Sequence, residues 1–420
     1  MIILAVRRWV PILSKLLGGQ ALIQIINLVT ALLLLRLMPV GEYALFVAAN
    51  LFISLGVIGS DLNLSTAFAT FGARLAGGKS ALSSLFLSVF YLRRWLYVLI
   101  ALIIPTMAPF VLTGHGWKAE TIVIVLIIVL VTVWFQQSIS LRSQVLNINH
   151  DLLGVFQSGL SGAITRLVLT YLFCLMWPVA ISALFVNLVA VLVVVWVTKS
   201  KCKLYLFEGA ASNEKDKTDL KKFIFPLIPS AIYFAFQGQI GLLLTSIMGN
   251  ASSIAEVGAL GRLGQIFVLL GVLNGFVFQP MFSRELKKER FILKFFVVTF
   301  ALIAGFLIIF VSSYVVPDMW LWLLGKNYQS LRDEVPVALA GSIINYLAGY
   351  VYTLLAARAF TGYQSWNIVL TVLIQSLFIV FIGINTTYSV LMFNLLTGAS
   401  TLFVQVILLG LMLKKWKSSQ

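Results

Sequence analysis

Charged side chains are scarce in this sequence: they make up 10% of its 420 residues, whereas hydrophobic residues make up 60%. A soluble domain of this length could not keep so much apolar surface out of water, so that class of protein is excluded. Acidic residues are the scarcest, with 14 Asp and Glu against 30 Lys and Arg. The basic segments lack interleaved aromatic residues, so the positive charge does not indicate a nucleic-acid partner.

What the chain has instead is a series of apolar stretches, each about 20 residues long, which is the length of helix that crosses a bilayer core about 30 Å thick. We predict an all-α, polytopic membrane protein with about 12 transmembrane helices. The expected spans are 13–35, 43–70, 95–112, 121–141, 154–176, 179–198, 223–248, 257–281, 295–316, 336–357, 366–385 and 389–413.

The distribution of basic residues predicts that both termini lie in the cytoplasm. Lysines and arginines cluster at 74–94, 199–222, 282–294 and 414–417, which all fall on one side if the N-terminus is inside. The run at 13–35 has no small-residue cleavage site, so it is expected to be a permanent span and not a signal peptide.

Metal centres and disulfides are not expected. With this topology Cys174 lies near the outer end of a span and Cys202 in a cytoplasmic loop, so a disulfide between them would have to cross the membrane. The only two histidines, His115 and His150, fall on opposite sides, and no metal-ligand spacing occurs. We therefore expect neither a metal nor a cofactor.

A polar loop divides the predicted spans into two sets of six. The expected organisation is an N-terminal six-helix half at 1–205, a cytoplasmic linker at 206–222 and a C-terminal six-helix half at 223–420. An even number of spans in each half would make the halves parallel repeats about an axis along the membrane normal. We expect them to surround a central cavity, as in a transporter.

Polar side chains recur at helical spacing inside several spans, so each set lies on one helix face. They either hold neighbouring membrane helices together or line a substrate cavity. The sets are Gln20, Gln24 and Asn27; Asn50, Ser54, Asp61 and Ser65; Ser230, Tyr233 and Gln237; Gly258, Arg262 and Gln265; and Asn394, Gly398, Thr401 and Gln405. In the cavity interpretation, the amides of Gln24, Asn27, Gln237 and Gln265 are candidate substrate-binding groups.

Four arginines are candidate substrate ligands, because a guanidinium is permanently charged and binds pyrophosphate through a rigid fork. Arg262 is the strongest candidate: it lies about a turn and a half from the outer end of its predicted span, among glycines that leave room for a substrate or a helix. Arg166 lies within a span, and both it and Arg262 have ion pairing, for example with Asp61, as the structural alternative. Arg36 and Arg358 lie at span ends, where they line the cavity or reach the interface.

Asp61 is the only carboxylate well inside a predicted span. Low dielectric around a membrane carboxylate favours proton binding near physiological pH, so Asp61 is a candidate ion-coupling residue. The alternative is a structural pair with an arginine.

No motif indicates an enzyme. Gly78-Lys79-Ser80 resembles the end of a phosphate-binding loop, but Ala73 stands at the required earlier glycine and no strand precedes it. The longest outer loop, 317–335, is too short for the active site of a sugar polymerase or ligase. Any energy source must then be an ion gradient, the membrane potential or a substrate gradient.

Three segments resemble polysaccharide-export flippases. Arg36–Phe46 is similar to their Arg-Leu…Pro…Glu-Tyr-Gly-Leu-Phe segment, Asp61–Ala67 to their Asp-Leu-Gly-Leu…Ala stretch, and Leu323–Tyr328 to their outer Leu-Leu-Gly…Tyr segment. With the 12 spans, the resemblance covers essentially the full chain and points to Wzx-type O-antigen flippases of the multidrug/oligosaccharidyl-lipid/polysaccharide (MOP) exporter superfamily. Ala44 and Asn63 depart from it, since glycine is usual at both positions.

This resemblance implies a flippase of the bacterial inner membrane. Such proteins move undecaprenyl-pyrophosphate-linked oligosaccharide, here an O-antigen repeat unit, from the cytoplasmic to the periplasmic leaflet by alternating access. The implied partners are that lipid-linked substrate, membrane lipids, and the polymerase and chain-length regulator of the same pathway. The alternative is an ion-coupled small-molecule or multidrug exporter of the same superfamily.

Overall fold

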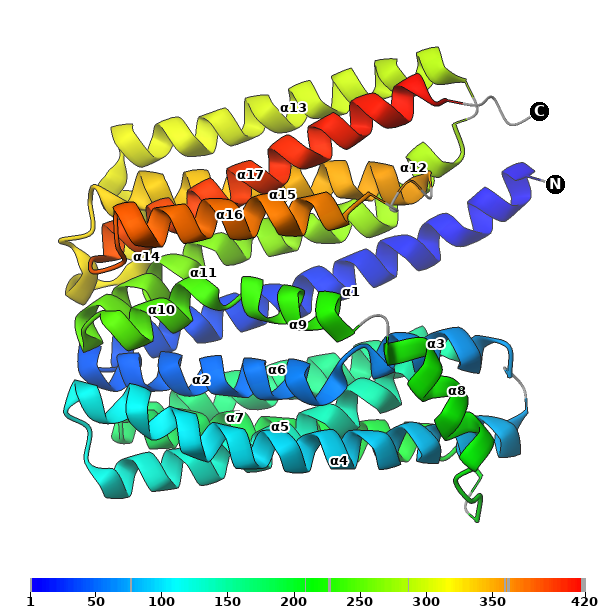
Figure 1. The fold of residues 1–420 in the computed structure, drawn as a ribbon, viewed down its shortest axis with the longest axis horizontal. Coiled ribbons are helices and arrows are strands. Elements are labelled where there is room, and N and C mark those ends of the chain that lie inside the picture. Colours follow the sequence, from blue (N-terminus) through cyan, green and yellow to red (C-terminus); the bar gives the residue numbers. More distant parts are fainter. Residues whose placement is uncertain are drawn as a thin grey trace. The chain divides into compact units, whose positions relative to one another are not determined.

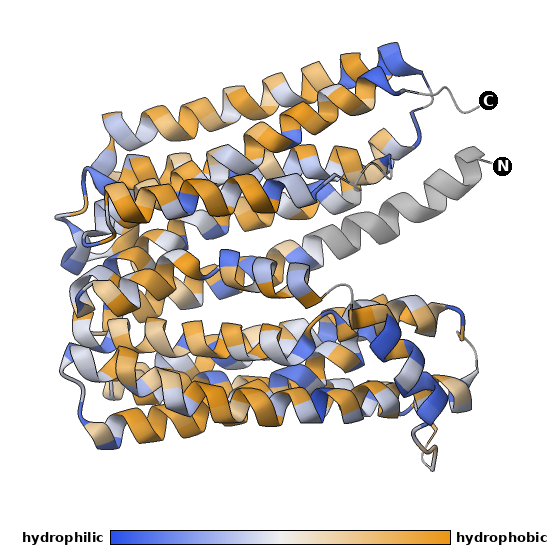
Figure 2. Ribbon diagram, in the orientation of Figure 1, coloured by the Kyte–Doolittle hydropathy of each residue, from blue (hydrophilic) through white to orange (hydrophobic). Residues whose placement is uncertain are grey.

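The computed structural model describes residues 2–75, 78–207, 209–225, 228–285, 287–358, 360 and 363–416, except for the side chains of 2–17, 230, 234, 235 and 276. Every regular element within these ranges is a helix (Figure 1). Figure 2 shows hydrophobic residues along the lengths of the helices and hydrophilic residues gathered at α8 and in the loops. The all-α, polytopic prediction is confirmed.

The α-helices are α1 (Ile2–Leu37), α2 (Val40–Asp61), α3 (Leu64–Ala73), α4 (Lys79–Leu112), α5 (Ala119–Ile148), α6 (Leu152–Met176), α7 (Ala180–Cys202), α8 (Glu214–Ile224), α9 (Ile228–Gln237), α10 (Ile240–Met248), α11 (Ala251–Leu273), α12 (Gln279–Ser283), α13 (Lys288–Val315), α14 (Pro317–Leu324), α15 (Glu334–Ala357), α16 (Ser365–Phe381) and α17 (Thr387–Lys414). Short 3₁₀ turns occupy Thr113–His115 and Lys326–Tyr328, and a π-turn occupies Asn274–Phe278.

In the described part of the chain, ten helices are long and apolar enough to cross a membrane. Of the remaining predicted spans, α16 is 17 residues long, and 223–248 is divided into α9 and α10. Several helix boundaries differ from the prediction, and two of these differences change the position of a site residue: α4 begins at Lys79 and not at 95, and α11 begins at Ala251 and not at 257. Both helices begin in polar sequence, so an apolar run starts later in the sequence than the helix does.

By its internal contacts the chain forms two compact units. Unit 2 comprises Ile25–Ala255, and unit 1 comprises Met1–Gln24 and Glu256–Gln420. Within unit 2, α9 and α10 pack against α2, and α10 also packs against α4. The division into six-helix halves at 206–222 stays a prediction. In unit 1, α15 packs along α17 and against α13, and α16 packs against α17 (Figure 1).

The break between α2 and α3 explains one departure from the flippase resemblance. Leu62 and Asn63 have φ values of 38° and 67°, in the left-handed region. Glycine enters this region at no steric cost, and asparagine tolerates it better than most residues do. Asn63 therefore serves at a position where glycine is usual, and the break divides the predicted span 43–70 into two helices.

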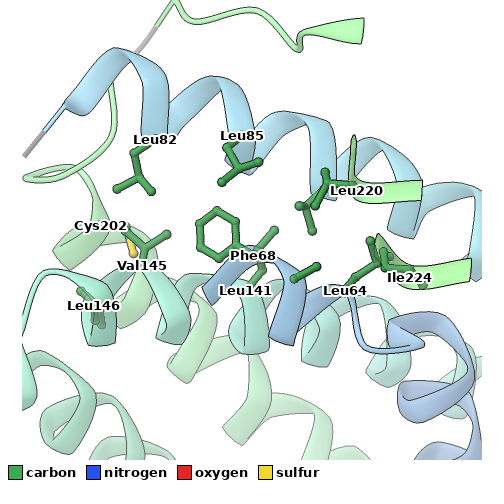
Figure 3. Packing of buried hydrophobic residues seen from close by; sticks show 12 residues of the cluster. Leu64, Phe68, Leu82, Leu85, Leu141, Val145, Leu146, Cys202, Leu220 and Ile224 are labelled. Atoms are coloured by element: carbon green, nitrogen blue, oxygen red, sulfur yellow. The ribbon is translucent and has the colours of Figure 1, made fainter. Parts of the chain in front are cut away.

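A packed cluster holds one end of unit 2 together (Figure 3). Phe68 of α3 lies among Leu82 and Leu85 of α4 and Leu141 of α5, and Leu220 of α8 covers the same cluster. These side chains are 3% exposed or less, so α3, α4, α5 and α8 share one apolar core. The amphipathic α8 is thereby attached to unit 2 through its apolar face.

Gly162 is a point of close approach between α6 and α7. A Cβ atom at this position would lie 2.4 Å from Cγ2 of Val194, which no real contact allows. We expect Gly162→Leu to lower the stability of the purified protein by about 1–3 kcal/mol, because the helices must separate. Thermal unfolding in detergent measures this. Gly305→Leu on α13 is the control, since a Cβ there meets nothing within 4 Å; equal losses in both variants would contradict the prediction.

Candidate functional site

Arg166 lies near the middle of α6, 14 residues after its start at Leu152 and ten before its end at Met176. Its Nη1 donates to Oδ1 of Asn27 on α1 at 3.4 Å, and both side chains are half-buried. Asn27 is likewise ten residues from the end of α1 at Leu37. The two predicted site residues are thus brought together at matching depths, about 15 Å from the ends of their helices.

Arg262 lies deeper than the sequence indicated. Because α11 begins at Ala251, Arg262 is 11 residues into the helix, about 16 Å along its axis, and not about a turn and a half from its outer end. The side chain is half-buried. The two glycines near Arg262 differ in the space around them. A Cβ at Gly261 would meet nothing within 4 Å, whereas a Cβ at Gly264 would lie 3.0 Å from Oγ of Ser342 on α15. One glycine thus allows helix packing, and the other leaves space beside Arg262.

Asp61 pairs with Arg93 of α4, an arginine that lies outside the predicted spans. Arg93 is 1% exposed; it forms an ion pair with Asp61, donates to Ser65 Oγ, and donates from Nη1 to the carbonyl of Gln137 at 2.8 Å. Asp61 Oδ1 also accepts from the backbone N–H of Ser65 at 3.1 Å. The carboxylate therefore joins α2, α3 and α4 across the break at Leu62.

The extension of α4 explains why Arg93 was missed. A helix starting at 95 would leave Arg93 in a loop, whereas the observed α4 has 34 residues and carries Arg93 on a buried face beside α5. The neighbouring Arg94 is exposed. The available signal was the polar face of this segment: Ser84 and Ser88 recur at helical spacing and bond to Asp216 and Asn213.

The other amides predicted to bind substrate are half-buried: Gln24 on α1, Gln237 at the end of α9 and Gln265 on α11. Their place in a substrate site remains a prediction. Arg36 is exposed in the last turn of α1.

Arg358 lies in an aromatic and polar cluster at one end of unit 1. Its guanidinium carbon is 3.9 Å from the ring centroid of Trp416 and 5.6 Å from that of Phe291, and Nη2 donates to the carbonyl of Glu285. Lys294 donates to the Glu285 carboxylate at 2.6 Å, which holds the pKa of that carboxyl below its ordinary value. These contacts favour a structural role for Arg358 at a helix end.

The polar stripe of the last span, Asn394, Gly398, Thr401 and Gln405 on α17, holds helices together. Gln405 on α17 exchanges amide hydrogen bonds with Gln364 at 2.7 and 3.0 Å, and Gln375 on α16 donates to Thr397 at 3.3 Å. A Cβ at Gly398 would lie 3.0 Å from Oδ1 of Asn345 on α15. For this stripe the contacts favour the helix-packing interpretation over the cavity interpretation.

No protein-family profile matches the chain, and no curated protein matches it in sequence. Its fold is similar to those of solved transporters. The lipid II flippase MurJ, in an inward closed conformation, matches with a TM-score of 0.75 at 13% identity, covering 94% of this chain and 87% of that one. An inward-facing multidrug resistance MATE family transporter of the MOP superfamily matches with a TM-score of 0.68 at 13% identity, covering 94% and 99%.

A mutant of the Vibrio cholerae MATE transporter VcmN matches less closely, with a TM-score of 0.58 at 14% identity, covering 96% of this chain and 95% of that one. At these identities the similarity shows the fold, which is a MATE- and MurJ-like transporter fold in a multi-pass membrane protein. This fold agrees with the prediction that the chain is not an enzyme.

Proposed function

We propose that this chain is a flippase that carries an undecaprenyl-pyrophosphate-linked oligosaccharide, of the O-antigen repeat-unit type, from the cytoplasmic to the periplasmic leaflet of a bacterial inner membrane. The observation that carries the proposal is the depth of two arginines: Arg166 lies mid-helix in α6 and Arg262 mid-helix in α11. The fold similarity to a lipid II flippase supports it.

Two arginines at this depth require a reason. On insertion scales a charged side chain at the bilayer centre costs about 2.5–3.5 kcal/mol, and such residues usually face a protein interior or a water-filled cavity. Moving a diphosphate through hydrocarbon without compensation is prohibitive. Guanidinium groups that replace water around the diphosphate would account for both facts, since arginine binds phosphate oxygens through paired N–H groups.

In this proposal Arg166 of unit 2, Arg262 of unit 1 and Arg36 at the end of α1 are each a ligand for the diphosphate, considered within its own unit. The half-buried amides of Gln24, Asn27, Gln237 and Gln265 offer donors and acceptors to sugar hydroxyls. Arg358 is left out, because it is engaged by Trp416 and the Glu285 carbonyl.

Alternating access is expected, with both termini in the cytoplasm, and the polymerase and chain-length regulator of the pathway would act on the product. Asp61 is the candidate for ion coupling. Because it pairs with buried Arg93, a coupling role requires this pair to open during the cycle.

Leaflet-resolved detection of the lipid-linked oligosaccharide in a deletion strain tests the function. We expect the oligosaccharide to accumulate in the cytoplasmic leaflet without the protein, and wild-type protein to restore the normal distribution. A normal distribution in the deletion strain, once redundant flippases are removed, would contradict the proposal.

The second candidate is an ion-coupled exporter of small molecules, favoured by the match that covers 99% of a multidrug MATE transporter. It predicts that deletion changes sensitivity to cationic dyes and leaves surface polysaccharide unchanged. Mid-helix arginines weigh against a cationic cargo, because like charges repel.

A further inference from the structure

A cavity of about 300 Å³ lies at the end of unit 2 where α7 ends. Its walls come from α4, α5, the last turn of α7 and the loop that follows. Its apolar lining includes Phe86 and Leu87 of α4 and Leu206 of the loop. The cavity contains none of the residues proposed to bind the transported substrate.

Three cations from different segments line this cavity: Arg142 of α5, Lys199 of α7 and Lys203 after α7. None of the described residues in its lining is acidic. Arg142 is half-buried, whereas Lys199 and Lys203 are exposed. A cavity with a positive rim and an apolar wall is complementary to a ligand that has an anionic group joined to a hydrocarbon.

The cavity is built into the fold. Ser83 is 2% exposed; its Oγ accepts from the backbone N–H of Phe207 at 2.7 Å and donates to the carbonyl of Lys79 at 2.7 Å. This fixes the loop over α4. Cys202, beside the three cations, belongs to the packed cluster of Figure 3 and bonds to the carbonyl of Arg142 at 3.5 Å. The site thus exists before any ligand binds.

Along the axis of α7, the cavity lies at the level expected for lipid headgroups. α7 has 23 residues and is about 34 Å long, close to the thickness of a bilayer core, so Lys199 and Lys203 lie near the membrane boundary. The distribution of basic residues predicts that this end faces the cytoplasm. That leaflet carries anionic lipids, and basic pockets between transmembrane helices on this side bind their headgroups.

We propose that this cavity binds an anionic phospholipid of the cytoplasmic leaflet. The lipid phosphate contacts Arg142, Lys199 and Lys203, and its glycerol and first acyl carbons pack against Phe86, Leu87 and Leu206. This proposal is independent of the transported substrate, because it concerns a resident lipid at one end of unit 2.

Binding of dioctanoyl phosphatidylglycerol to the purified full chain in detergent tests the proposal, with native mass spectrometry as the measurement. We expect saturable binding that is about 30-fold weaker in the double variant Lys199→Gln/Lys203→Gln, since each lysine contributes about 1 kcal/mol. Lys221→Gln/Lys222→Gln is the matched control: it removes the same charge from exposed positions of α8 that do not line the cavity. We expect this control to bind as wild type does.

Ala210→Trp distinguishes binding inside the cavity from binding to a basic surface, because the tryptophan side chain fills the cavity without changing the charge. We expect it to weaken binding as well. The proposal is wrong if Ala210→Trp binds normally, if the α8 control loses as much affinity as the cavity variant, or if dioctanoyl phosphatidylcholine binds equally. Equal binding of inorganic pyrophosphate would also overturn it, since the site would then recognise a free anion and not a lipid.

Discussion

Replacing Arg93 alone by leucine is expected to destabilise the protein by at most about 3–5 kcal/mol, the cost of removing one partner of a fully buried ion pair; the remaining Asp61 side chain is 26% exposed, which lowers the loss. Arg93 is 1% exposed and holds Asp61, Ser65 and the Gln137 carbonyl together. Without it, Asp61 loses its ion-pair partner at the break between α2 and α3. Thermal or denaturant unfolding of the purified protein in detergent measures the effect.

Arg94→Leu is the matched control for this experiment, because Arg94 is the exposed neighbour on the same helix. We expect it to change stability by less than about 1 kcal/mol. The double variant Arg93→Leu/Asp61→Leu should be more stable than Arg93→Leu alone, since it leaves no carboxylate without its partner. Equal unfolding of Arg93→Leu and Arg94→Leu would show that the pair contributes little.

The same pair decides how Asp61 is understood. A structural carboxylate affects stability, and its replacement leaves any dependence of transport on an ion gradient unchanged. An ion-coupling carboxylate also controls that dependence. Asp61→Asn, assayed in vesicles with and without an imposed proton gradient, distinguishes the two roles: full transport under both conditions would remove Asp61 from the coupling mechanism.

Sequence patterns were sufficient for the fold because the bilayer imposes a length and an apolar composition on each span. They were insufficient at helix ends. The first turns of α4 carry Ser83 and Ser84 and those of α11 carry Ser252 and Ser253, so an apolar run begins too late in both helices. The shifts of 16 and six residues changed the interpretation of Arg93 and of the depth of Arg262.

Partners distant in sequence were the second limit. Arg93 and Asp61 are 32 residues apart, and Gln364 and Gln405 are 41 residues apart. Helical spacing shows which residues share a face, but it does not show which helix that face meets. For this reason the spacing of the stripe containing Gln405 is compatible with both a cavity and helix packing, and its partner Gln364 favours helix packing. Asn27 and Arg166, which contact each other, remain residues of the proposed site.

Replacing Arg262 by glutamine is expected to reduce flipping of the lipid-linked oligosaccharide by about 10- to 100-fold. A charge-assisted hydrogen bond contributes about 1.5–3 kcal/mol, and glutamine retains donors without the charge. Arg262→Lys should keep part of the activity, because it retains the charge but not the paired N–H geometry. The measurement is the leaflet distribution of the substrate in the deletion strain complemented with each variant.

Arg332→Gln is the control, since it removes the same charge from an exposed position in the turn before α15 of the same unit. We expect it to support a normal distribution at equal protein abundance. If Arg262→Gln did so too, Arg262 could not be the diphosphate ligand, and its depth in α11 would then reflect packing beside Gly264 and α15. Loss of flipping in Arg262→Gln together with normal membrane abundance would instead assign the mid-helix charge to the substrate, because a packing defect of that size would also reduce the folded protein.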